Sequence, residues 1–423
     1  GNLKGYDILL HDYGTMNWSD VTRSAIAYAD GGWIVRPHVY FYAMQDEEAQ
    51  GRVHNTDIVG YTSEGRKLYL DSDGQFRKPG SLIRNPDLGR ILKNIASEGI
   101  DVFYKGYIAE RIDEDMKANG GLMTFNDLKN YKTVRSEPVW GEYRGHKIAS
   151  NQPPGGGVMI QEMLQILEHF DLQAMGHNSP DYIATVAEAM KWATIDKDKK
   201  MGDPAFDEVP VAEFTDRNYA GELAERIKRG EKANVVRYGQ PEESKDTTHV
   251  TVVDADGNAV SMTHSLGMPS GVVTRGLGIM YNGCMGAFDP RPGLPGSILP
   301  GKRRFTALCP TIVFNGDDPY IVVGAPGGTF ITMGVLQAIL NVMDFDMTML
   351  EAVSAPRITA NSNTIDVSNR IPKFVTNKLV TRGYPVSRSP FSYVFSGVHA
   401  IRIVDGRWDG GADPGRDGMA LAI

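Results

Sequence analysis

The sequence has little cysteine, no long apolar run and no excess of positive charge. Its two cysteines, Cys284 and Cys309, cannot form a zinc site, and their spacing leaves open whether they pair; we favour two small buried hydrophobic residues. No stretch of about 18 apolar residues occurs, so no transmembrane helix is predicted. The net charge of −8 argues against a surface for nucleic acid or anionic membrane.

Motifs for metal and phosphate chemistry are also missing. The nine histidines include no His-x-x-x-His pair. Residues 254–258 (DADGN) begin like a calcium loop, but Ala259 and Ser265 stand where such a loop needs Gly and Glu. Residues 324–329 lack the lysine of a phosphate loop, and no Gly-x-Ser-x-Gly elbow is present. We therefore expect no metal, no other cofactor, and neither nucleic acid nor a membrane as a partner.

The most informative segment is DTTHVTVVDADGNAV, residues 246–260. Its β-branched run predicts a strand, and Asp256-Gly257 predicts a two-residue hairpin turn before a second strand at 259–265. His249 points opposite to Thr248 along the strand and is interpreted as structural. The segment follows the polar residues 230–246, which are typical of a mobile linker.

The rest of the chain divides by character at this hairpin. With 423 residues and 41% hydrophobic content, a large core of one or two domains is expected. Before the hairpin, residues 1–240 are predicted to be mainly helical, with strand-like character at 139–150. After it, strands and helices alternate irregularly. The predicted helices cover 19–29, 87–97, 101–118, 157–170, 180–196, 329–343, 348–354 and 373–382, and the predicted strands cover 311–314, 320–324 and 398–404.

An Asp-Thr bond before a buried strand is where a self-cleaving hydrolase exposes a new N-terminal threonine. Such a threonine carries its own base, because its freed α-amine lies within reach of its hydroxyl. The reference pKa of an α-amine is roughly 7.7–8, so it accepts a proton near neutrality. A Thr-Thr pair at the head of a strand is also ordinary β-propensity, and spacing alone favours that interpretation over catalysis.

Several motifs in the same order resemble the γ-glutamyltransferase family of N-terminal-nucleophile hydrolases. Beside residues 246–260, they are CPTIV (309–313), GAPGG (324–328), ADPGRDG (412–418), YGTM (13–16), FYKG (103–106), NGGLMT (119–124), YRG (143–145) and NQPPGGG (151–157). The resemblance spans essentially the whole chain. It is closer to a divergent branch of acylases and oxamate amidohydrolase than to the glutathione-cleaving members.

The resemblance implies an α+β fold, the four-layer αββα sandwich of these hydrolases. It implies that Thr247 attacks the carbonyl of Asp246 and splits a precursor. Residues 1–246 would form the large-subunit portion and residues 247–423 the small catalytic subunit, together one αββα domain. Family members have a further N-terminal segment that supplies part of the substrate site, and we expect the same here.

The resemblance also implies the catalytic residues. Thr247 is the nucleophile, and the backbone amides of Gly327 and Gly328 stabilise the oxyanion. Ser265 falls where the family places a threonine that positions the nucleophile. Thr248 is a weaker candidate, since strand packing explains it as well.

The residues that bind a glutamyl group in the family are changed here. Ala287 stands at the acidic position for the ammonium, and Gly286 replaces the acid beside it. The serine pair for the carboxylate falls on residues 306–307 (TA), and the expected asparagine is Gly267. An ammonium that loses its ion pair is strongly disfavoured in a buried site. We therefore expect an amide hydrolase or acyltransferase for another acyl group.

Basic residues before the 309–313 motif offer another way to bind a substrate. Arg303, Arg304 and Thr306 could hold a substrate carboxylate, and an equally weighted interpretation makes the arginines surface charges. A genuine γ-glutamyltransferase and a non-catalytic protein that keeps the fold remain as alternatives. A small-molecule amide is the expected substrate. The large and small fragments are the expected partners, while homo-oligomer formation and the cellular compartment stay open.

Overall fold

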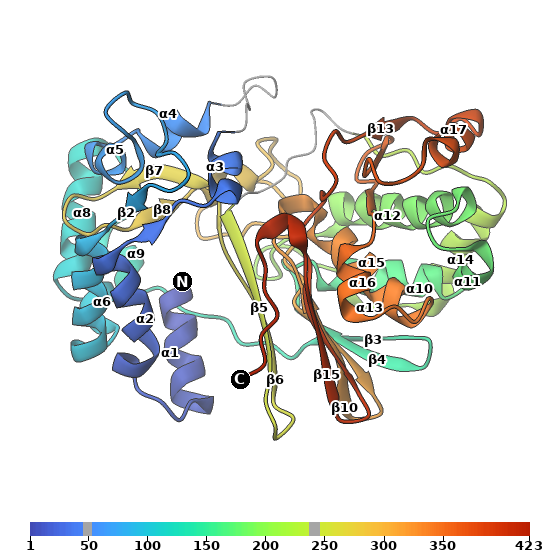
Figure 1. Cartoon of the computed structure of the whole chain (residues 1–423), viewed down its shortest axis with the longest axis horizontal. Coiled ribbons are helices and arrows are strands. Elements are labelled where there is room, and N and C mark those ends of the chain that lie inside the picture. The colour runs from blue at the N-terminus through green and yellow to red at the C-terminus, as the bar shows by residue number, and fades with distance from the viewer. Residues whose placement is uncertain (45–52, 237–245) are drawn as a thin grey trace. The chain divides into compact units, whose positions relative to one another are not determined.

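The chain divides into two compact units, which we describe separately (Figure 1). The computed structural model describes residues 1–44, 53–236 and 246–423, with Asp246 described by its backbone alone. The first unit comprises Gly1–Arg135 and Pro269–Gly283, and the second comprises Ser136–Met268 and Cys284–Ile423. Residues 237–245 of the predicted linker lie outside the described residues. All predicted site residues belong to the second unit.

The first unit is mainly helical. Its elements are α1 (Asn2–Tyr13), α2 (Trp18–Gly31), β1 (Trp33–Ile34), α3 (Pro37–Ala43), α4 (Asn55–Val59), α5 (Ser63–Tyr69), β2 (Leu82–Ile83), α6 (Pro86–Glu98), α7 (Asp101–Tyr104), α8 (Tyr107–Asn119), α9 (Phe125–Lys129), β7 (Pro269–Val273) and β8 (Met280–Asn282). Ile91, Ile95, Ile108 and Ile112 form the centre of its core. The single helix predicted over 101–118 is wrong, because Gly106 is extended and caps α8.

The second unit contains the larger sheet and the predicted site. Its elements are β3 (Val139–Tyr143), β4 (His146–Ser150), α10 (Gly157–Leu167), α11 (Leu172–Met175), α12 (Pro180–Lys200), α13 (Val211–Phe214), α14 (Arg217–Lys228), β5 (Asp246–Val253), β6 (Ala259–Gly267), η2 (Cys284–Ala287), β9 (Thr311–Asn315), β10 (Asp318–Gly324), η3 (Gly328–Phe330), α15 (Ile331–Met343), α16 (Met349–Ser354), β11 (Ile358–Thr359), β12 (Ile365–Val367), α17 (Lys373–Thr381), β13 (Val386–Arg388), β14 (His399–Val404), β15 (Arg407–Ala412) and η4 (Pro414–Arg416).

Two β layers and a helical layer build the second unit. The six-stranded sheet has the order β15-β14-β10-β9-β4-β3, and all its neighbouring strands are antiparallel. Helices α10 and α15 pack on this sheet, and the β5–β6 hairpin packs against β10 and β14 (Figure 1). Leu336, Ile339 and Leu340 of α15 are fully buried in the resulting core.

The predicted hairpin is present, but its turn is longer than predicted. The backbone of Asp254 donates to the carbonyl of Asn258, which closes a loop around residues 255–257. The Asp254 carboxylate accepts the N–H groups of Asp256 and Asn258, and Gly257 adopts a φ of +86°. The two-residue turn is therefore wrong, because the Asp254 side chain stabilises a wider loop.

The glycines of the 151–157 motif lead the chain from β4 directly into α10. A Cβ on Gly157 would lie 2.1 Å from the carbonyl oxygen of Asn151, so only glycine fits this approach. Helix α10 then follows as the sequence predicts, and all of its residues are buried.

No disulfide joins the two cysteines. Cys309 is fully buried, and this burial raises the pKa of its thiol. Cys284 is half-buried, and its thiol donates to the carbonyl of Leu266. The interpretation as buried hydrophobic residues is therefore correct for Cys309 and wrong for Cys284. Separately, no helix within the described residues combines the length and the apolar character needed to span a bilayer.

Candidate functional site

Two hydroxyl groups meet at the head of the β5–β6 hairpin. The Oγ1 of Thr247 lies 2.7 Å from the Oγ of Ser265, and the Ser265 hydroxyl accepts the N–H of Gly267 at 2.8 Å. The strand register shifts between Asp246 and Thr247, because Asp246 pairs with Gly267 whereas Thr247 pairs with Ser265. The extra residue is Leu266 on β6, so this β-bulge lies opposite the predicted scissile bond, and bulges are a common way to redirect a side chain next to an active site.

Contacts farther along the hairpin fasten it to strand β10. The hydroxyl of Ser261 donates to the carbonyl of Val323, and Ser261 pairs with Thr251 across the hairpin. The His249 ring covers Gly324, where an added Cβ would lie 2.2 Å from the imidazole Cε1. His249 is buried and Thr248 is exposed, which confirms their opposite orientations along β5.

These contacts fix the relative direction of β5 and β10. The two strands run in opposite directions, because His249 faces Gly324 while Thr251 lies level with Val323. Thr247 is two residues beyond His249, and Gly327 is three residues beyond Gly324. The Thr247 end of β5 and the glycine loop therefore extend the same way from their shared contact.

The glycine loop has a backbone that only glycine adopts easily. Gly327 has a φ of +140° and Gly328 a φ of +59°. A Cβ on Gly327 would lie 2.4 Å from the Cα of Ser396, so Ser396 packs directly against the loop. The N–H of Gly397 donates to the carbonyl of Pro326 at 2.9 Å and ties the same segment to the loop.

The segment that supports the glycine loop is itself strained. Phe395 and Ser396 have φ values of +65° and +77°, although neither is glycine, and both are buried. The Arg357 guanidinium donates to the carbonyl of Ser396 and forms an ion pair with Asp413, whose side chain is 1% exposed. Backbone strain of this kind persists only where the surroundings over-determine it and clusters at functional sites.

The predicted substrate-binding residues lie in different surroundings. Asp203 binds Arg303, because its carboxylate accepts hydrogen bonds from both the backbone N–H and the guanidinium of Arg303. Burial alone would raise the pKa of Asp203, but these hydrogen bonds hold the pKa below its usual value. The N–H of Thr306 donates to the carbonyl of Pro154, and its hydroxyl accepts from Leu308. Ala287 is exposed at the end of η2. Gly267 lies beside Ser265, as described above.

Sequence reasoning missed the support behind the glycine loop. Asp413 belongs to the 412–418 motif, so the sequence marks it as a residue shared with the family. Nothing in the sequence links Asp413 to Arg357 or Ser396. Sequence reasoning also missed the proximity of His399 to His249. A positive charge on His399 disfavours the protonation of His249.

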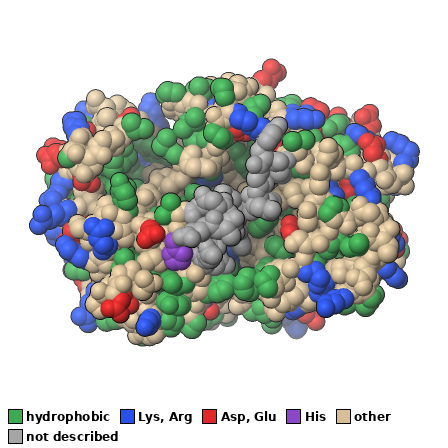
Figure 2. Space-filling view, turned by 90° about the horizontal axis from the view of Figure 1, so that it is seen from above, with side chains coloured by type: hydrophobic (Ala, Val, Ile, Leu, Met, Phe, Trp, Pro, Cys, Tyr) green, Lys and Arg blue, Asp and Glu red, His purple; other side chains and the backbone are tan. Residues whose placement is uncertain are grey.

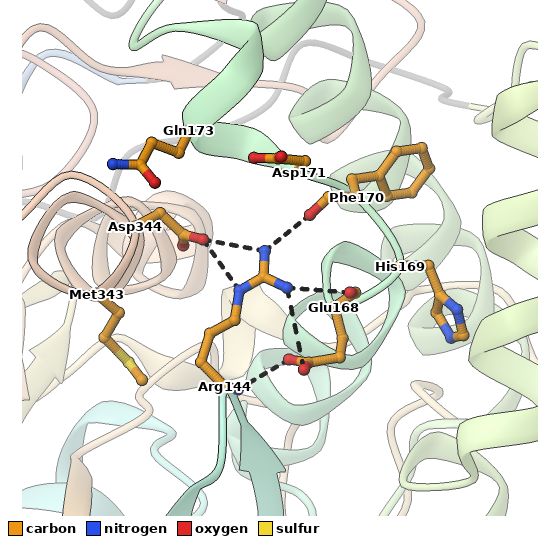
Figure 3. Close-up of a pocket in the computed structure, with 8 residues that line it drawn as sticks. All are labelled: Arg144, Glu168, His169, Phe170, Asp171, Gln173, Met343 and Asp344. Atoms are coloured by element: carbon orange, nitrogen blue, oxygen red, sulfur yellow. Dashed lines mark hydrogen bonds and ion pairs between the residues drawn. The ribbon is translucent and has the colours of Figure 1, made fainter.

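A surface pocket of about 520 Å³ lies away from these residues, between Glu168–Asp171 and the end of α15 (Figure 3). Figure 3 shows the Arg144 side chain at its centre, pointing toward Asp344 and Glu168. Arg144 donates to the carbonyls of Glu168 and Phe170 and forms an ion pair with Asp344 at 3.0 Å. These contacts join the β3–β4 turn to the helical layer, so we interpret the pocket as structural.

The charged surface and the side-chain clusters give no other catalytic candidate. On the face in Figure 2, basic and acidic side chains are interspersed. Across residues 1–44, 53–236 and 246–423, no three His, Cys, Asp or Glu side chains gather as a metal-ion site would require.

The buried His249 predicts a loss of stability in acid. Burial, and then the charge of His399, lower the pKa of His249 to about 3, so the folded protein keeps it neutral while the unfolded chain binds a proton below about 6.5. Its stabilising contribution is therefore present above pH 6.5 and is lost as the pH falls toward 3, by about 1.4 kcal/mol per pH unit. Melting temperatures between pH 7 and 4 measure this slope. His249→Asn should flatten the slope, and equal slopes in both proteins would contradict the assignment.

Comparison with known proteins identifies the family. The sequence profile of gamma-glutamyltranspeptidase matches residues 1–423. The acylase ACY 1 proenzyme of Pseudomonas sp. (strain V22) is 37% identical over 427 residues, which cover 100% of this chain and 74% of the relative. The chain belongs to the gamma-glutamyltranspeptidase family. The glutathione hydrolase proenzyme of Escherichia coli (strain K12) is 36% identical over 84% of this chain and 63% of its own length.

A solved structure gives the fold of this gamma-glutamyltranspeptidase family member. The crystal structure of cephalosporin acylase from Bacillus halodurans superposes with a TM-score of 0.86 at 27% identity, over 97% of this chain and 75% of that one. The predicted α+β fold of the N-terminal-nucleophile hydrolases is confirmed. These two relatives are named as proenzymes, one of an acylase and one of a glutathione hydrolase, which indicates that each of them is made as a precursor.

Proposed function

We propose that the protein is a self-processing amide hydrolase in which Thr247 becomes the N-terminal nucleophile. The supporting observation is the hydroxyl pair of Thr247 and Ser265, which lies where the β-bulge at Leu266 of β6 faces the Asp246–Thr247 bond. Ser265 already accepts the N–H of Gly267, so its oxygen is held in one place against the threonine hydroxyl. A hydroxyl held in one place beside the scissile bond is what an intramolecular attack needs.

The first reaction processes the precursor. The Oγ1 of Thr247 attacks the carbonyl carbon of Asp246, the C–N bond breaks, and the hydroxyl proton passes to the leaving nitrogen. Water then hydrolyses the ester, which leaves a carboxylate on Asp246 and a free amine and hydroxyl on Thr247. The large product ends at Asp246 and the small product begins at Thr247.

The second reaction uses the exposed threonine on a substrate amide. The α-amine of Thr247 takes the proton of its own hydroxyl, and the hydroxyl oxygen attacks the substrate carbonyl. The C–N bond of the amide then breaks, the leaving amine takes the proton back from the α-ammonium, and the acyl group stays on Thr247 as an ester. The amides of Gly327 and Gly328 stabilise the oxyanion, a contribution of typically about 3–4 kcal/mol per donor. Water or an amine then releases the acyl group and restores the threonine.

The acyl group is proposed to differ from γ-glutamyl. Residues 282–288 (NGCMGAF) contain no acidic side chain that would bind an α-ammonium. This agrees with the relatedness to a proenzyme named as an acylase. The 36% identity to a glutathione hydrolase supports a second candidate, hydrolysis of a γ-glutamyl amide by other contacts.

Mass spectrometry of the purified protein tests this proposal, followed by turnover of acyl p-nitroanilides. We expect two fragments, the smaller one beginning at Thr247, and a burst of p-nitroaniline equal to the amount of cleaved protein. An intact chain without a burst would favour a non-catalytic protein that keeps the fold. A burst with γ-glutamyl p-nitroanilide at full rate would favour the second candidate.

A further inference from the structure

A basic pocket lies in the first unit, whereas the residues of the proposed reaction belong to the second. Its volume is about 300 Å³, at the lower end of the range for small-molecule sites. The side chains that line it are three cations and three aliphatic groups, namely Lys67, Arg77, Arg84, Leu68, Leu82 and Ile83. Of the described residues, no acidic one lines this pocket. A hollow lined by one sign of charge concentrates counter-ions of the opposite sign.

A small apolar core fixes the walls of this pocket. Ile83 of β2 is 2% exposed and belongs to a core with Val35, Leu70 and Phe76. Arg84 directly follows Ile83 in the chain, and Arg77 directly follows the buried Phe76. Both arginines are therefore attached to backbone that is held in place before a ligand arrives, which reduces the entropy cost of binding.

Backbone carbonyls orient the two guanidinium groups and use only some of their donors. Arg77 donates from Nε to the carbonyl of Leu68 and from Nη2 to that of Lys67, both at 3.0 Å. Arg84 donates from Nε to the carbonyl of Gly31 at 3.1 Å. A guanidinium carries five N–H donors, so its Nη groups still face outward on Arg84. Within the described part of the chain, nothing accepts from them, and this edge is one that binds an oxyanion with two parallel hydrogen bonds.

The three cations receive little compensation from the protein. Lys67 pairs with Glu64 at 2.8 Å, but the lysine side chain is 68% exposed, and surface pairs of this kind are weak. Across residues 1–44, 53–236 and 246–423, no carboxylate lies within 4.0 Å of Arg77 or Arg84. An anion in the pocket would offset the repulsion among the three positive charges.

We propose that this pocket binds the phosphate group of a small phosphate ester. A phosphate dianion presents three oxygens in different directions and can accept from Arg77, Arg84 and Lys67 together, whereas one guanidinium fork already matches a carboxylate. Leu82, which is 43% exposed, offers an apolar wall for the body of the ester. This site is separate from the proposed function of Thr247 and does not depend on it.

Calorimetric titration of the purified protein tests the proposal. The probes are phenyl phosphate, inorganic phosphate and succinate at about pH 7.5, well above the second pKa of a phosphate ester near 6. Sodium chloride keeps the ionic strength constant, because exposed charges respond to any salt. We expect one saturable site per chain, with a Kd for phenyl phosphate of about 1 mM or lower. Inorganic phosphate, which has no apolar body, should bind about threefold more weakly, and succinate at least about tenfold more weakly.

Variants identify the side chains that bind the phosphate. Arg84→Gln should raise the Kd for phenyl phosphate at least about tenfold, because it removes the charged fork. Arg84→Lys should recover part of this loss, since it restores the charge alone. Lys67→Gln should raise the Kd about threefold, because this lysine is shared with Glu64. Arg90→Gln is the matched control and should bind like the wild type, since Arg90 is an exposed arginine of the same unit that pairs with Asp87 and does not line the pocket.

Melting temperatures give an independent measure of the same site. A ligand that binds only the folded protein stabilises it, so phenyl phosphate should raise the melting temperature of the wild type and of Arg90→Gln above that in sodium chloride, and raise that of Arg84→Gln much less. Heats that do not saturate, or equal affinities in the wild type and Arg84→Gln, would overturn the proposal. Succinate binding as tightly as phenyl phosphate would overturn the assignment to phosphate. If Arg84→Gln does not fold, an unchanged Kd in Lys67→Gln has the same consequence as equal affinities.

Discussion

Thr247→Ala is expected to leave the chain in one piece and to lower turnover by at least about 10⁴-fold. The variant lacks the oxygen that attacks Asp246 and later the substrate, and removal of a nucleophile costs most of the rate enhancement. Its folding should change little, because one hydrogen bond to Ser265 contributes only about 1 kcal/mol. Denaturing gels, intact mass and p-nitroaniline release measure the three effects on one preparation.

Two neighbouring variants serve as controls for this result. Thr247→Ser keeps a hydroxyl and should still cleave and turn over, more slowly because the extra rotamer freedom loosens its position. Thr248→Ala removes an exposed hydroxyl on the opposite side of β5 and should behave like the wild type. A Thr247→Ala protein that still splits at residue 246 and hydrolyses amides would exclude this threonine as the nucleophile.

The sequence was sufficient where the signal is local. The β-branched run and the glycine after it predict the β5–β6 hairpin, and the helix predicted over 157–170 is present as α10. The order of several motifs along the chain predicted the fold class, which the cephalosporin acylase structure confirms. These features depend on residues that are close in the chain or in a fixed order.

The sequence failed where a feature depends on contacts between distant segments. The bulge at Leu266, opposite Asp246–Thr247, depends on the pairing register of β5 with β6, which no local pattern fixes. Arg303 and Arg304 are equivalent as sequence, yet Asp203, a hundred residues away in the chain, binds only the first. The loop at 254–258 became wider because one aspartate side chain accepts two backbone N–H groups.

A buried ion pair supports the glycine loop, and its loss is expected to lower both stability and turnover. Arg357 and Asp413 form an ion pair with side chains 3% and 1% exposed, and Arg357 also holds the carbonyl of the strained Ser396 against Gly327. Arg357→Met removes the charge and leaves Asp413 buried without it, which typically costs about 3–5 kcal/mol. We also expect kcat to fall about 10²-fold with a small change in KM, because a displaced Gly327 loses its donor geometry toward the oxyanion.

A second ion pair in the same unit separates positioning from stability. Arg144→Met removes the partner of Asp344 at the pocket of Figure 3, outside the proposed site, and should lower the melting temperature with kcat unchanged. Both variants are assayed well below their melting temperatures, with kcat expressed per cleaved molecule. If Arg357→Met unfolds, Asp413→Asn keeps the shape and the hydrogen-bond acceptor for Gly415 while removing only the charge. A normal kcat in a folded Arg357 or Asp413 variant would mean that the glycine loop holds its geometry without the buried pair.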